Sequence, residues 1–499
     1  MILGIDLGTT YSVGAYVDAD GEPKVAVNSE GERLTPSVVM VEDKKRYIVG
    51  SVAKENCMIQ PEDVISTVKN HMGKKVKFKV PCEVEYSPEE ISSFIIKKVV
   101  KDSGESTGKR IDQVVVTVPA YFTDAQRKAT EDAVALAGVN LAGMINEPTA
   151  AALYYVHKNK LDKANIMVYD LGGGTFDVTI LTIDGNTVNV KSTGGLSNAG
   201  GFFFDMHIVD YVCNQMKDKY NVWLKEDEYR DVYQDLCIKA EKCKIQLSNK
   251  DSATIAVWFG SIKENIVITR DFLESKIKSL YIRTESKMKE AIRNAGMKVE
   301  DIDCVLLVGG SSKIPYITYK IESFLGKKPS KEVNPDEAVA LGAAIYGQML
   351  ENENRNKIKK FSDVCSHSIG IVIINRDSKR QENFILIPRN SKVPISNKQR
   401  FRTFCQNQSI IELTITEGEF KELTDITTIG TYEVELPKGL EEESLVEITI
   451  SLDRDQIVHI HLDIPSAKLS KEYKMERKTN LSEEEIRYLT GIYRDSIVK

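Results

Sequence analysis

The chain has 499 residues, of which 42% are hydrophobic and 28% are charged, and its formal net charge is -6. This length exceeds what one hydrophobic core usually supports, so two or more domains are expected. The negative charge gives no general attraction to phosphate backbones or anionic lipid surfaces, which argues against nucleic acid and membrane as partners. No apolar run is long enough to span a bilayer.

The eight cysteines are scattered and form no Cys-x-x-Cys pair. The chain opens directly into a buried-strand pattern, with no secretory leader ahead of it. Reduced thiols and a cytoplasmic location are therefore expected.

The first 350 residues alternate short apolar strands with helical segments, which is typical of an α/β fold. The clearest strand patterns are 1–6, 114–118, 166–169 and 304–308. Helical periodicity is best at 125–137, 204–219, 229–247, 270–295 and 336–350. This arrangement predicts a first domain that ends near residue 352.

A polar stretch begins there and predicts a linker at 353–364. Beyond it, short β-branched segments separated by turns predict an antiparallel β-sandwich at 365–466. Those segments are 368–374, 384–388, 410–417, 430–435, 446–452 and 457–462. A charged tail at 467–499 follows, in which Ser482 and Glu485 form a capping-box pattern ahead of a short helix.

Two similar motifs follow buried strands in the first domain. One is Asp6-Leu7-Gly8-Thr9-Thr10, and the other is Asp170-Leu171-Gly172-Gly173-Gly174-Thr175. Glycines let a turning backbone point its N–H groups at a polyphosphate, a carboxylate can hold a hydrated Mg²⁺, and a threonine hydroxyl can donate to a phosphate. One copy would be weak support, but two copies indicate two similar lobes that grip one nucleotide from opposite sides.

A third glycine element, Gly309-Gly310-Ser311-Ser312, follows the strand that ends at Val308. Its small residues would let adenine and ribose lie against the backbone. Taken alone, an ordinary strand-to-helix turn explains it equally well.

Longer motifs make a family resemblance specific. They are Gly4 through Ser12, Val116-Thr117-Val118-Pro119-Ala120-Tyr121-Phe122, Ile145-Asn146-Glu147-Pro148-Thr149, Asp170 through Asp177, and Val308 through Pro315. In this order the first 350 residues resemble the seventy-kilodalton heat-shock (DnaK-like) chaperone family. The resemblance implies an actin-like, two-lobed ATPase domain at 1–352, ATP or ADP and Mg²⁺ as cofactors, and weak ATPase activity.

The resemblance also implies roles for individual residues. Asp6 and Asp170 would position Mg²⁺ through water, Lys69 would contact the γ-phosphate and the attacking water, and Glu147 would orient the water or metal. Catalysis would thus rest on Lys69, Glu147, Asp170 and Thr175. The phosphate contacts would come from Gly8, Thr9, Thr10, Tyr11, Gly172, Gly173, Gly174 and Thr175, with Gly200 and Gly201 nearby.

The adenosine side of the site would lie mainly on one helix. Glu241, Lys244 and Ser248 are spaced i, i+3 and i+7, on one helical face, and resemble the family's ribose and adenine contacts. A charged, solvated helix face is the alternative. Gly309, Gly310, Ser311, Lys313 and Asp336 would complete the nucleotide site.

The second half resembles the peptide-binding β-domain of the family, though less closely. By position, the groove would be lined or arched over by Ile371, Ile373, Ile374, Phe401, Phe404, Ile411 and Leu413. The family tends to have a small residue where Phe404 stands, which predicts a partly blocked groove. For all of these residues, the core of a sandwich is the competing interpretation.

Several departures from the family pattern bear on function. The leucine cluster of the family's linker is replaced by Lys359-Lys360-Phe361-Ser362, and the basic residue that recruits a J-domain co-chaperone is missing near Gly143. Two acidic positions after Gly201 are occupied by Phe202 and Phe203. Only the first helix of the family's lid is indicated, at 482–498, which predicts weak, fast-exchanging peptide binding.

The leading hypothesis is an ATP-dependent, DnaK-like chaperone that binds unfolded or extended polypeptide, with a J-domain co-chaperone and a nucleotide-exchange factor as the partners that the family implies. The alternative is an ATP-regulated module that binds one dedicated protein, which the charged linker and Phe404 favour. A sugar-kinase-type phosphotransferase would explain the phosphate loops but not the β-domain.

Overall fold

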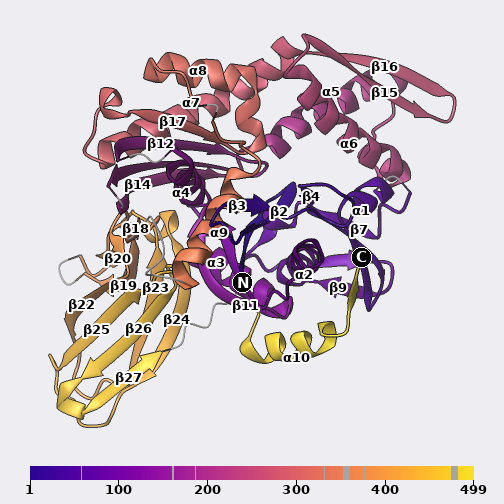
Figure 1. Ribbon diagram of the computed structural model, residues 1–499. Helices are drawn as coiled ribbons and strands as arrows, with labels where there is room; N and C mark the ends of the chain where they lie inside the picture. The colour runs from indigo at the N-terminus through magenta and orange to yellow at the C-terminus, as the bar shows by residue number, and fades with distance from the viewer. Residues whose placement is uncertain are drawn as a thin grey trace.

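The computed structural model describes residues 1–57, 59–159, 162–185, 187–330, 332–351, 360–375, 378–473 and 481–499. Residues up to 351 form two lobes, the β-rich part after residue 360 packs beneath them, and the last segment returns to the first lobe (Figure 1).

Lobe I is built on a mixed sheet with helices on its faces. Its strands are β1 (Ile2–Leu7), β2 (Tyr11–Val17), β3 (Pro23–Val25), β4 (Thr35–Pro36), β10 (Gln113–Val118) and β11 (Asn140–Asn146). A smaller sheet contains β5 (Val38–Asp43), β6 (Arg46–Val49) and β7 (Val64–Ser66), and β8 (Phe78–Val80) pairs with β9 (Val84–Tyr86). The helices are α1 (Ser51–Asn56), η1 (Val68–His71), α2 (Pro88–Thr107), α3 (Asp124–Leu136) and α4 (Glu147–Asn159).

Lobe II repeats the central plan of lobe I. Its main strands are β12 (Lys163–Leu171), β13 (Thr175–Asp184), β14 (Thr187–Ser197) and β17 (Cys304–Val308), and β15 (Ser252–Phe259) pairs with β16 (Ile262–Thr269). Its helices are α5 (Gly201–Tyr220), η2 (Asp227–Tyr229), α6 (Arg230–Leu247), α7 (Arg270–Asn294), η3 (Val299–Asp301), η4 (Gly310–Lys313) and α8 (Pro315–Leu325), and α9 (Ala338–Glu351) packs back on lobe I.

The two glycine motifs occupy equivalent places in these lobes. β1 is antiparallel to β2 and parallel to β10, and β12 is likewise antiparallel to β13 and parallel to β17. Each motif forms the turn of an antiparallel hairpin at the carboxyl end of a buried strand. The two turns also lie close together, because a Cβ added to Gly173 would come within 2.7 Å of Thr10 Oγ1.

The β-rich part consists of two four-stranded antiparallel sheets around one core. One sheet contains β19 (Ile369–Ile374), β20 (Gln381–Ile387), β23 (Ile410–Glu417) and β24 (Thr427–Glu435). The other contains β22 (Ile395–Arg402), β25 (Leu445–Leu452), β26 (Val458–Ile464) and β27 (Leu469–Tyr473), and short η5 (Leu423–Asp425) and η6 (Pro465–Ala467) turns connect strands. Fully buried side chains from both sheets, including Ile415 and Ile450, fill the space between them.

The predicted linker differs from the structure in its second half. Residues 352–359 lie outside the described residues, but Lys360–Val364 forms strand β18. β18 runs parallel to β14 of lobe II and antiparallel to β21 (Lys392–Val393), so one sheet extends from lobe II into the β-rich part. Strand pairing uses backbone groups, which explains why the charged sequence around Lys360 still joins the sheet.

The tail also returns to the ATPase-like part rather than covering the sandwich. Ser482 is the N-cap of helix α10 (Glu483–Tyr493), and its side chain accepts from the Glu485 N–H in a capping box. Strand β28 (Ile497–Val498) then adds to the edge of β6 in parallel orientation. Figure 1 shows α10 below α2, on the side of lobe I away from the hairpin β15–β16.

Candidate active site

A cavity of about 440 Å³ lies between the two lobes. Most of the predicted nucleotide-site residues line it. From the ends of β1 and β12 and from their neighbours in both lobes come Asp6, Gly8, Thr9, Thr10, Tyr11, Lys69, Glu147, Asp170, Gly172, Gly173, Thr175, Gly201, Glu241, Lys244, Ser248, Gly309, Gly310, Ser311, Lys313 and Asp336.

Two predicted residues lie just outside this cavity. Gly174 lines a smaller cavity of about 240 Å³ together with Asn70 and Tyr121, which shares Thr9 and Lys69 with the first. Gly200 supports the Gly172–Gly174 loop from behind, because the N–H of Gly201 donates to the Gly172 carbonyl at 3.0 Å. With φ of +147° and a Cβ position 2.5 Å from the Gly172 oxygen, position 200 admits only glycine.

Buried carboxylates concentrate at the floor of the cavity. Burial, reinforced by Glu147, raises the pKa of Asp6 to about 7, and burial with Glu147 raises the pKa of Asp170 well above its ordinary value. Oδ2 of Asp170 is buried and has no hydrogen-bond partner. A divalent cation would relieve both the repulsion and the unsatisfied oxygen, so these residues fit a hydrated Mg²⁺.

Lys69 is a buried cation beside these carboxylates. Its ammonium group pairs with Oε1 of Glu147, and only 7% of the residue is exposed. Burial by itself would lower the Lys69 pKa, but Glu147 and Asp6 outweigh that effect and the pKa is raised. The buried neighbours Val68 and Met72 hold the short helix η1, so that Lys69 points into the cavity.

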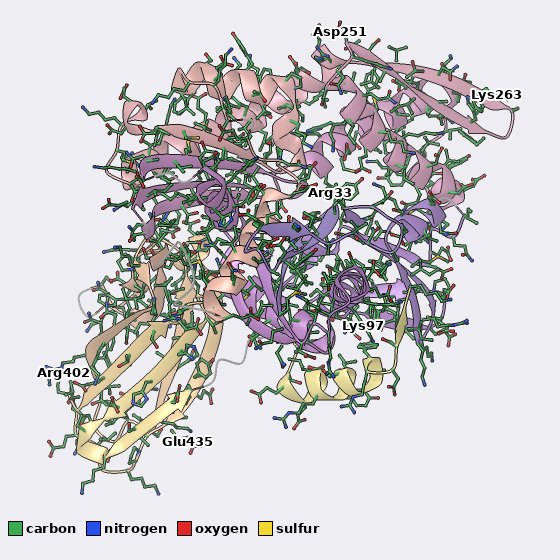
Figure 2. All side chains as sticks on the ribbon, viewed as in Figure 1. Arg33, Lys97, Asp251, Lys263, Arg402 and Glu435 are labelled. Atoms are coloured by element: carbon green, nitrogen blue, oxygen red, sulfur yellow. The ribbon has the colours of Figure 1, made fainter. Side chains whose placement is uncertain are left out.

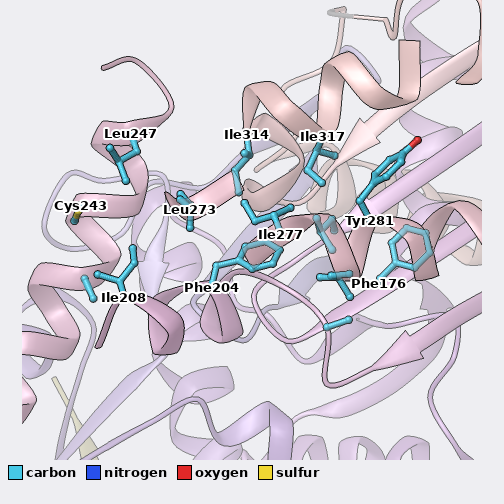
Figure 3. Close-up of a cluster of buried hydrophobic side chains, with 14 of the residues drawn as sticks. Phe176, Phe204, Ile208, Cys243, Leu247, Leu273, Ile277, Tyr281, Ile314 and Ile317 are labelled. Atoms are coloured by element: carbon cyan, nitrogen blue, oxygen red, sulfur yellow. The ribbon is translucent and has the colours of Figure 1, made fainter. Parts of the chain in front are cut away.

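The helix face predicted for adenosine is presented to the cavity by the core on its other side. Ala240, Cys243 and Leu247 of α6 are buried in the core of lobe II, where α6 packs against α5 and β15. Figure 3 shows Cys243 and Leu247 within this cluster. The opposite face carries Glu241 and Lys244.

Each of those two side chains already has a polar partner at the cavity wall. Lys244 Nζ donates to the Gly201 carbonyl at 3.0 Å and lies 2.8 Å from Asp205 Oδ2. Lys54 of lobe I donates to Glu241 Oε2 at 2.6 Å and thereby bridges the two lobes. These pairs explain why the charged face is not simply a solvated surface.

No sequence motif predicted the apolar wall of the cavity. Leu34, Ile245, Ile314 and Val339 line it and offer flat apolar surface suited to a purine ring. Apolar residues of this kind carry no motif. Only Ile245 could have been suspected from the sequence, because it lies between Lys244 and Ser248, which were predicted to contact adenosine.

The predicted peptide-groove residues fall into three groups. Ile371 and Leu413 are each 2% exposed and belong to the sandwich core, so the competing core interpretation holds for them. Ile373, Phe401 and Ile411 are half-buried at the edge of that core, although the backbone of each lies in a strand. Ile374 and Phe404 are exposed by 53% and 57%, which places apolar surface at one end of the sandwich.

Comparisons with known proteins agree with this architecture. The family model described as Hsp70 protein matches residues 2–492. The chain is 38% identical over 494 residues to the chaperone protein DnaK of Thermosipho melanesiensis, with 97% of this chain and 82% of that protein covered. It is 37% identical over 501 residues to the DnaK proteins of Thermotoga neapolitana and Thermotoga petrophila, with the same coverage.

Hsp70 proteins are ATPases with chaperone function and bind ATP or ADP with Mg²⁺, which suits the carboxylates and the glycine turns of this cavity. Within the residues that the structure describes, no helix is both long enough and apolar enough to cross a membrane. The family match over nearly the whole length and the two-lobed fold with its sandwich lead to one conclusion: this chain belongs to the Hsp70 family of ATP-dependent, DnaK-like chaperones.

Proposed function

We propose that this chain binds Mg²⁺–ATP in the cavity between its lobes, hydrolyses it slowly, and uses the nucleotide state to control polypeptide binding by the β-sandwich. The observation that carries the proposal is the meeting of Asp6, Lys69, Glu147 and Asp170 with the two glycine turns in one cavity. We further propose the domain limits 1–352, 353–364, 365–466 and 467–499, with the strand Lys360–Val364 as the docked part of the linker.

Each side chain has a part in the hydrolysis that we propose. The turn N–H groups and the hydroxyls of Thr9, Thr10 and Thr175 bind the phosphates. Lys69 remains protonated through the neutral range because its pKa is raised, so it offers a fixed positive charge beside the γ-phosphate. Glu147 holds Lys69 and accepts a hydrogen bond from the attacking water. A Mg²⁺ held through water by Asp6 and Asp170 would supply further charge neutralisation.

The contacts between the domains support a coupled mechanism. Asn146, the residue before Glu147, donates to Oδ2 of Asp363 in β18 at 2.9 Å, and Arg127 donates to Asn146 at 2.7 Å. Farther along, Arg389 of the sandwich pairs with Glu290 of lobe II at 2.8 Å. A change around Glu147 on hydrolysis would therefore reach the strand that leads into the sandwich, despite the charged sequence at 359–362.

The partner and location that we propose are those of a cytoplasmic chaperone. All eight cysteines are free thiols, which suits a reducing compartment. Extended, apolar polypeptide is the proposed ligand, because Ile374 and Phe404 expose apolar surface on the sandwich. Nothing in the comparisons favours a module for one dedicated partner.

Single-turnover ATP hydrolysis with Mg²⁺ at near-neutral pH tests the proposal, with and without an extended apolar peptide. We expect Lys69→Ala to reduce the rate at least about 100-fold, because positioning and charge neutralisation carry this chemistry. Lys75→Ala, at an exposed position of the same segment, is the matched control. Equal rates for Lys69→Ala and the wild type would refute the site, and a rate unaffected by peptide would refute the coupling.

A further inference from the structure

The tail, residues 481–499, has the sequence of an amphipathic helix followed by a strand. Ile486, Leu489 and Tyr493 recur at i, i+3 and i+7 on α10, and Ile497 and Val498 are β-branched. α10 lies against α3, and Tyr493 is 5% exposed, whereas Tyr488 on the same helix is 70% exposed. The helix therefore uses one face to dock and leaves the other in water.

Tyr493 is the anchor of this docking. Its ring meets Phe94 edge to face at a centroid distance of 5.0 Å and contacts Tyr47 in the same way at 6.3 Å. Its hydroxyl donates to Oε1 of Glu90, so the polar end of the buried ring is satisfied.

Lysines of α2 and the edge of β6 hold the backbone beyond Tyr493. Lys97, which is labelled in Figure 2, donates from its Nζ to the carbonyls of Tyr493 and Ser496 at 2.8 and 2.9 Å. Lys101 donates to the Val498 carbonyl at 3.1 Å. The N–H groups of Ile497 and Lys499 donate to Lys45 and Tyr47, and the Val49 N–H donates to Lys499.

Lobe I binds the tail as other proteins bind peptides through strand addition. The tail backbone pairs with β6, and a side-chain pocket holds Tyr493. The tail contacts that the structure describes go to lobe I, mainly to its residues 42–49, 90–101 and helix α3, and Glu485 also faces the charges of Lys75 and Lys77. They do not cross the cleft that holds the nucleotide. The surface of lobe I that binds the tail consequently keeps its geometry when the two lobes move relative to each other.

Binding of the tail to lobe I also limits how far the sandwich can move. The last described residue of the sandwich is Tyr473 and the tail is described from Leu481, eight residues on. Eight residues span at most about 29 Å when fully extended. A sandwich tied to lobe I by this short connection and to lobe II by strand β18 has a high effective concentration at its docking surface.

We infer that residues 493–499 occupy an intramolecular binding site on lobe I and act as a latch, which holds the sandwich beside the ATPase domain with either nucleotide bound. The latch works in addition to β18 and the polar domain contacts, and it does not depend on what the sandwich binds. Its ligand is a segment with a buried tyrosine followed by a β-branched strand, supplied by this chain.

Small-angle X-ray scattering of the full chain with ATP and with ADP tests the latch. The wild type and Tyr488→Ala should keep one radius of gyration with both nucleotides, whereas Tyr493→Ala should expand with ADP. In parallel, hydrogen exchange of the amides at 45–49 should accelerate at least about tenfold in Tyr493→Ala. Binding of ADP is the check that Tyr493→Ala remains folded.

A second variant keeps the test independent of the aromatic core. Ile497 is 52% exposed and donates its N–H to Lys45, so Ile497→Pro removes a ladder bond without opening a cavity. It should expand the ADP form as Tyr493→Ala does. The latch is overturned if the wild type already expands with ADP, or if both variants stay as compact as the wild type.

Discussion

Glu417 offers a sharp test of how the sandwich docks, because it is a carboxylic acid buried between the domains. It ends strand β23, and its Oε1 accepts from the Asp124 N–H of lobe I at 3.3 Å. Burial, reinforced by Asp124, raises its pKa from an ordinary 4.5 to about 8, despite the opposing charge of Arg127. Undocking would expose Glu417 to water and return its pKa toward the ordinary value.

The sign of the pH effect follows from these two values. Below pH 4.5 the acid is protonated in both states, so it does not affect docking. Between pH 4.5 and 8 the undocked form loses its proton and the docked form keeps it, so docking weakens as pH rises. The cost is about 1.4 kcal/mol for each pH unit, or about 3 kcal/mol at pH 7 as an upper limit.

Other titrating groups at the interface change the balance in a lower pH range. Burial raises the pKa of Asp363 to about 6 and lowers the pKa of His367 below its ordinary 6.5. Measurements between pH 7 and 9 therefore lie above the pKa of both groups, and comparison with Glu417→Gln identifies the part that Glu417 contributes. The equilibrium constant for docking should fall up to about tenfold from pH 7 to 8 and then level off.

Energy transfer between one fluorophore on the exposed Cys405 and a second on position 263 of a Lys263→Cys variant would report docking in each buffer. Glu417→Gln should remove the slope and strengthen docking at pH 8. Glu412→Gln, on the same strand but exposed, should behave as the wild type. The same slope in Glu417→Gln and the wild type would refute the assignment.

Further predictions concern the cavity and the sandwich. Asp170→Asn should abolish the gain in ATP affinity that Mg²⁺ gives, while leaving metal-free ATP binding nearly unchanged. Titration calorimetry with and without EDTA would measure both affinities. An undiminished gain would contradict a metal role for Asp170. Lys54→Ala should speed ADP release severalfold, because it removes the Lys54–Glu241 bridge between the lobes. An unchanged rate of ADP release in a stopped-flow measurement would argue against that bridge. Phe404→Ser should weaken binding of an extended apolar peptide, as measured by fluorescence anisotropy. Because Phe404 is exposed, the same change should alter the free energy of unfolding by less than about 0.5 kcal/mol. Unaltered peptide affinity would place the groove elsewhere.

The parts of the fold that were predictable have strong local signals. The strands that end at Asp6 and Asp170 are continuous apolar runs that end in glycine, so their positions and their equivalence in two lobes could be inferred. Helix α10 carries a complete capping box, and the structure places its start at the predicted residue. The roles assigned to residues within the cavity remain predictions.

The elements that escaped prediction have weak or misleading signals. β22 alternates exposed and half-buried residues, but Asn397 and Gln399 share the inward positions with Ile395 and Phe401, so it shows no hydrophobic alternation. β18 contains lysine, serine and aspartate and resembles a linker, yet its backbone pairs with β14. In both cases the deciding interaction is with a segment that is distant in sequence, which periodicity does not reveal.

Contacts of the tail with lobe I are equally invisible in the sequence, because Tyr493 and Tyr488 differ only in which face of α10 they occupy. Their exposures, 5% and 70%, separate an anchor from a surface residue. The helical stripe of Leu489 and Tyr493 gave the face, but not its partner. Only the fold shows that this face meets Phe94 and Glu90 of lobe I rather than the sandwich.

Glu417 and the tail act on the same equilibrium from separate places, which allows one last prediction. Glu417 contacts Asp124, whereas Tyr493 contacts Glu90 and Phe94, so their effects on docking should add. At pH 8 with ADP, Glu417→Gln introduced into Tyr493→Ala should recover docking that the single Tyr493→Ala variant loses.

That recovery separates a latch from a structural role of the tail. A latch raises the effective concentration of the sandwich, and any change that strengthens docking compensates for its loss. If Tyr493→Ala instead loosens lobe I itself, a stronger contact at Glu417 has no intact surface to bind, and the double variant should stay as expanded as Tyr493→Ala. The fluorescence pair on Cys405 and residue 263 distinguishes the two outcomes directly.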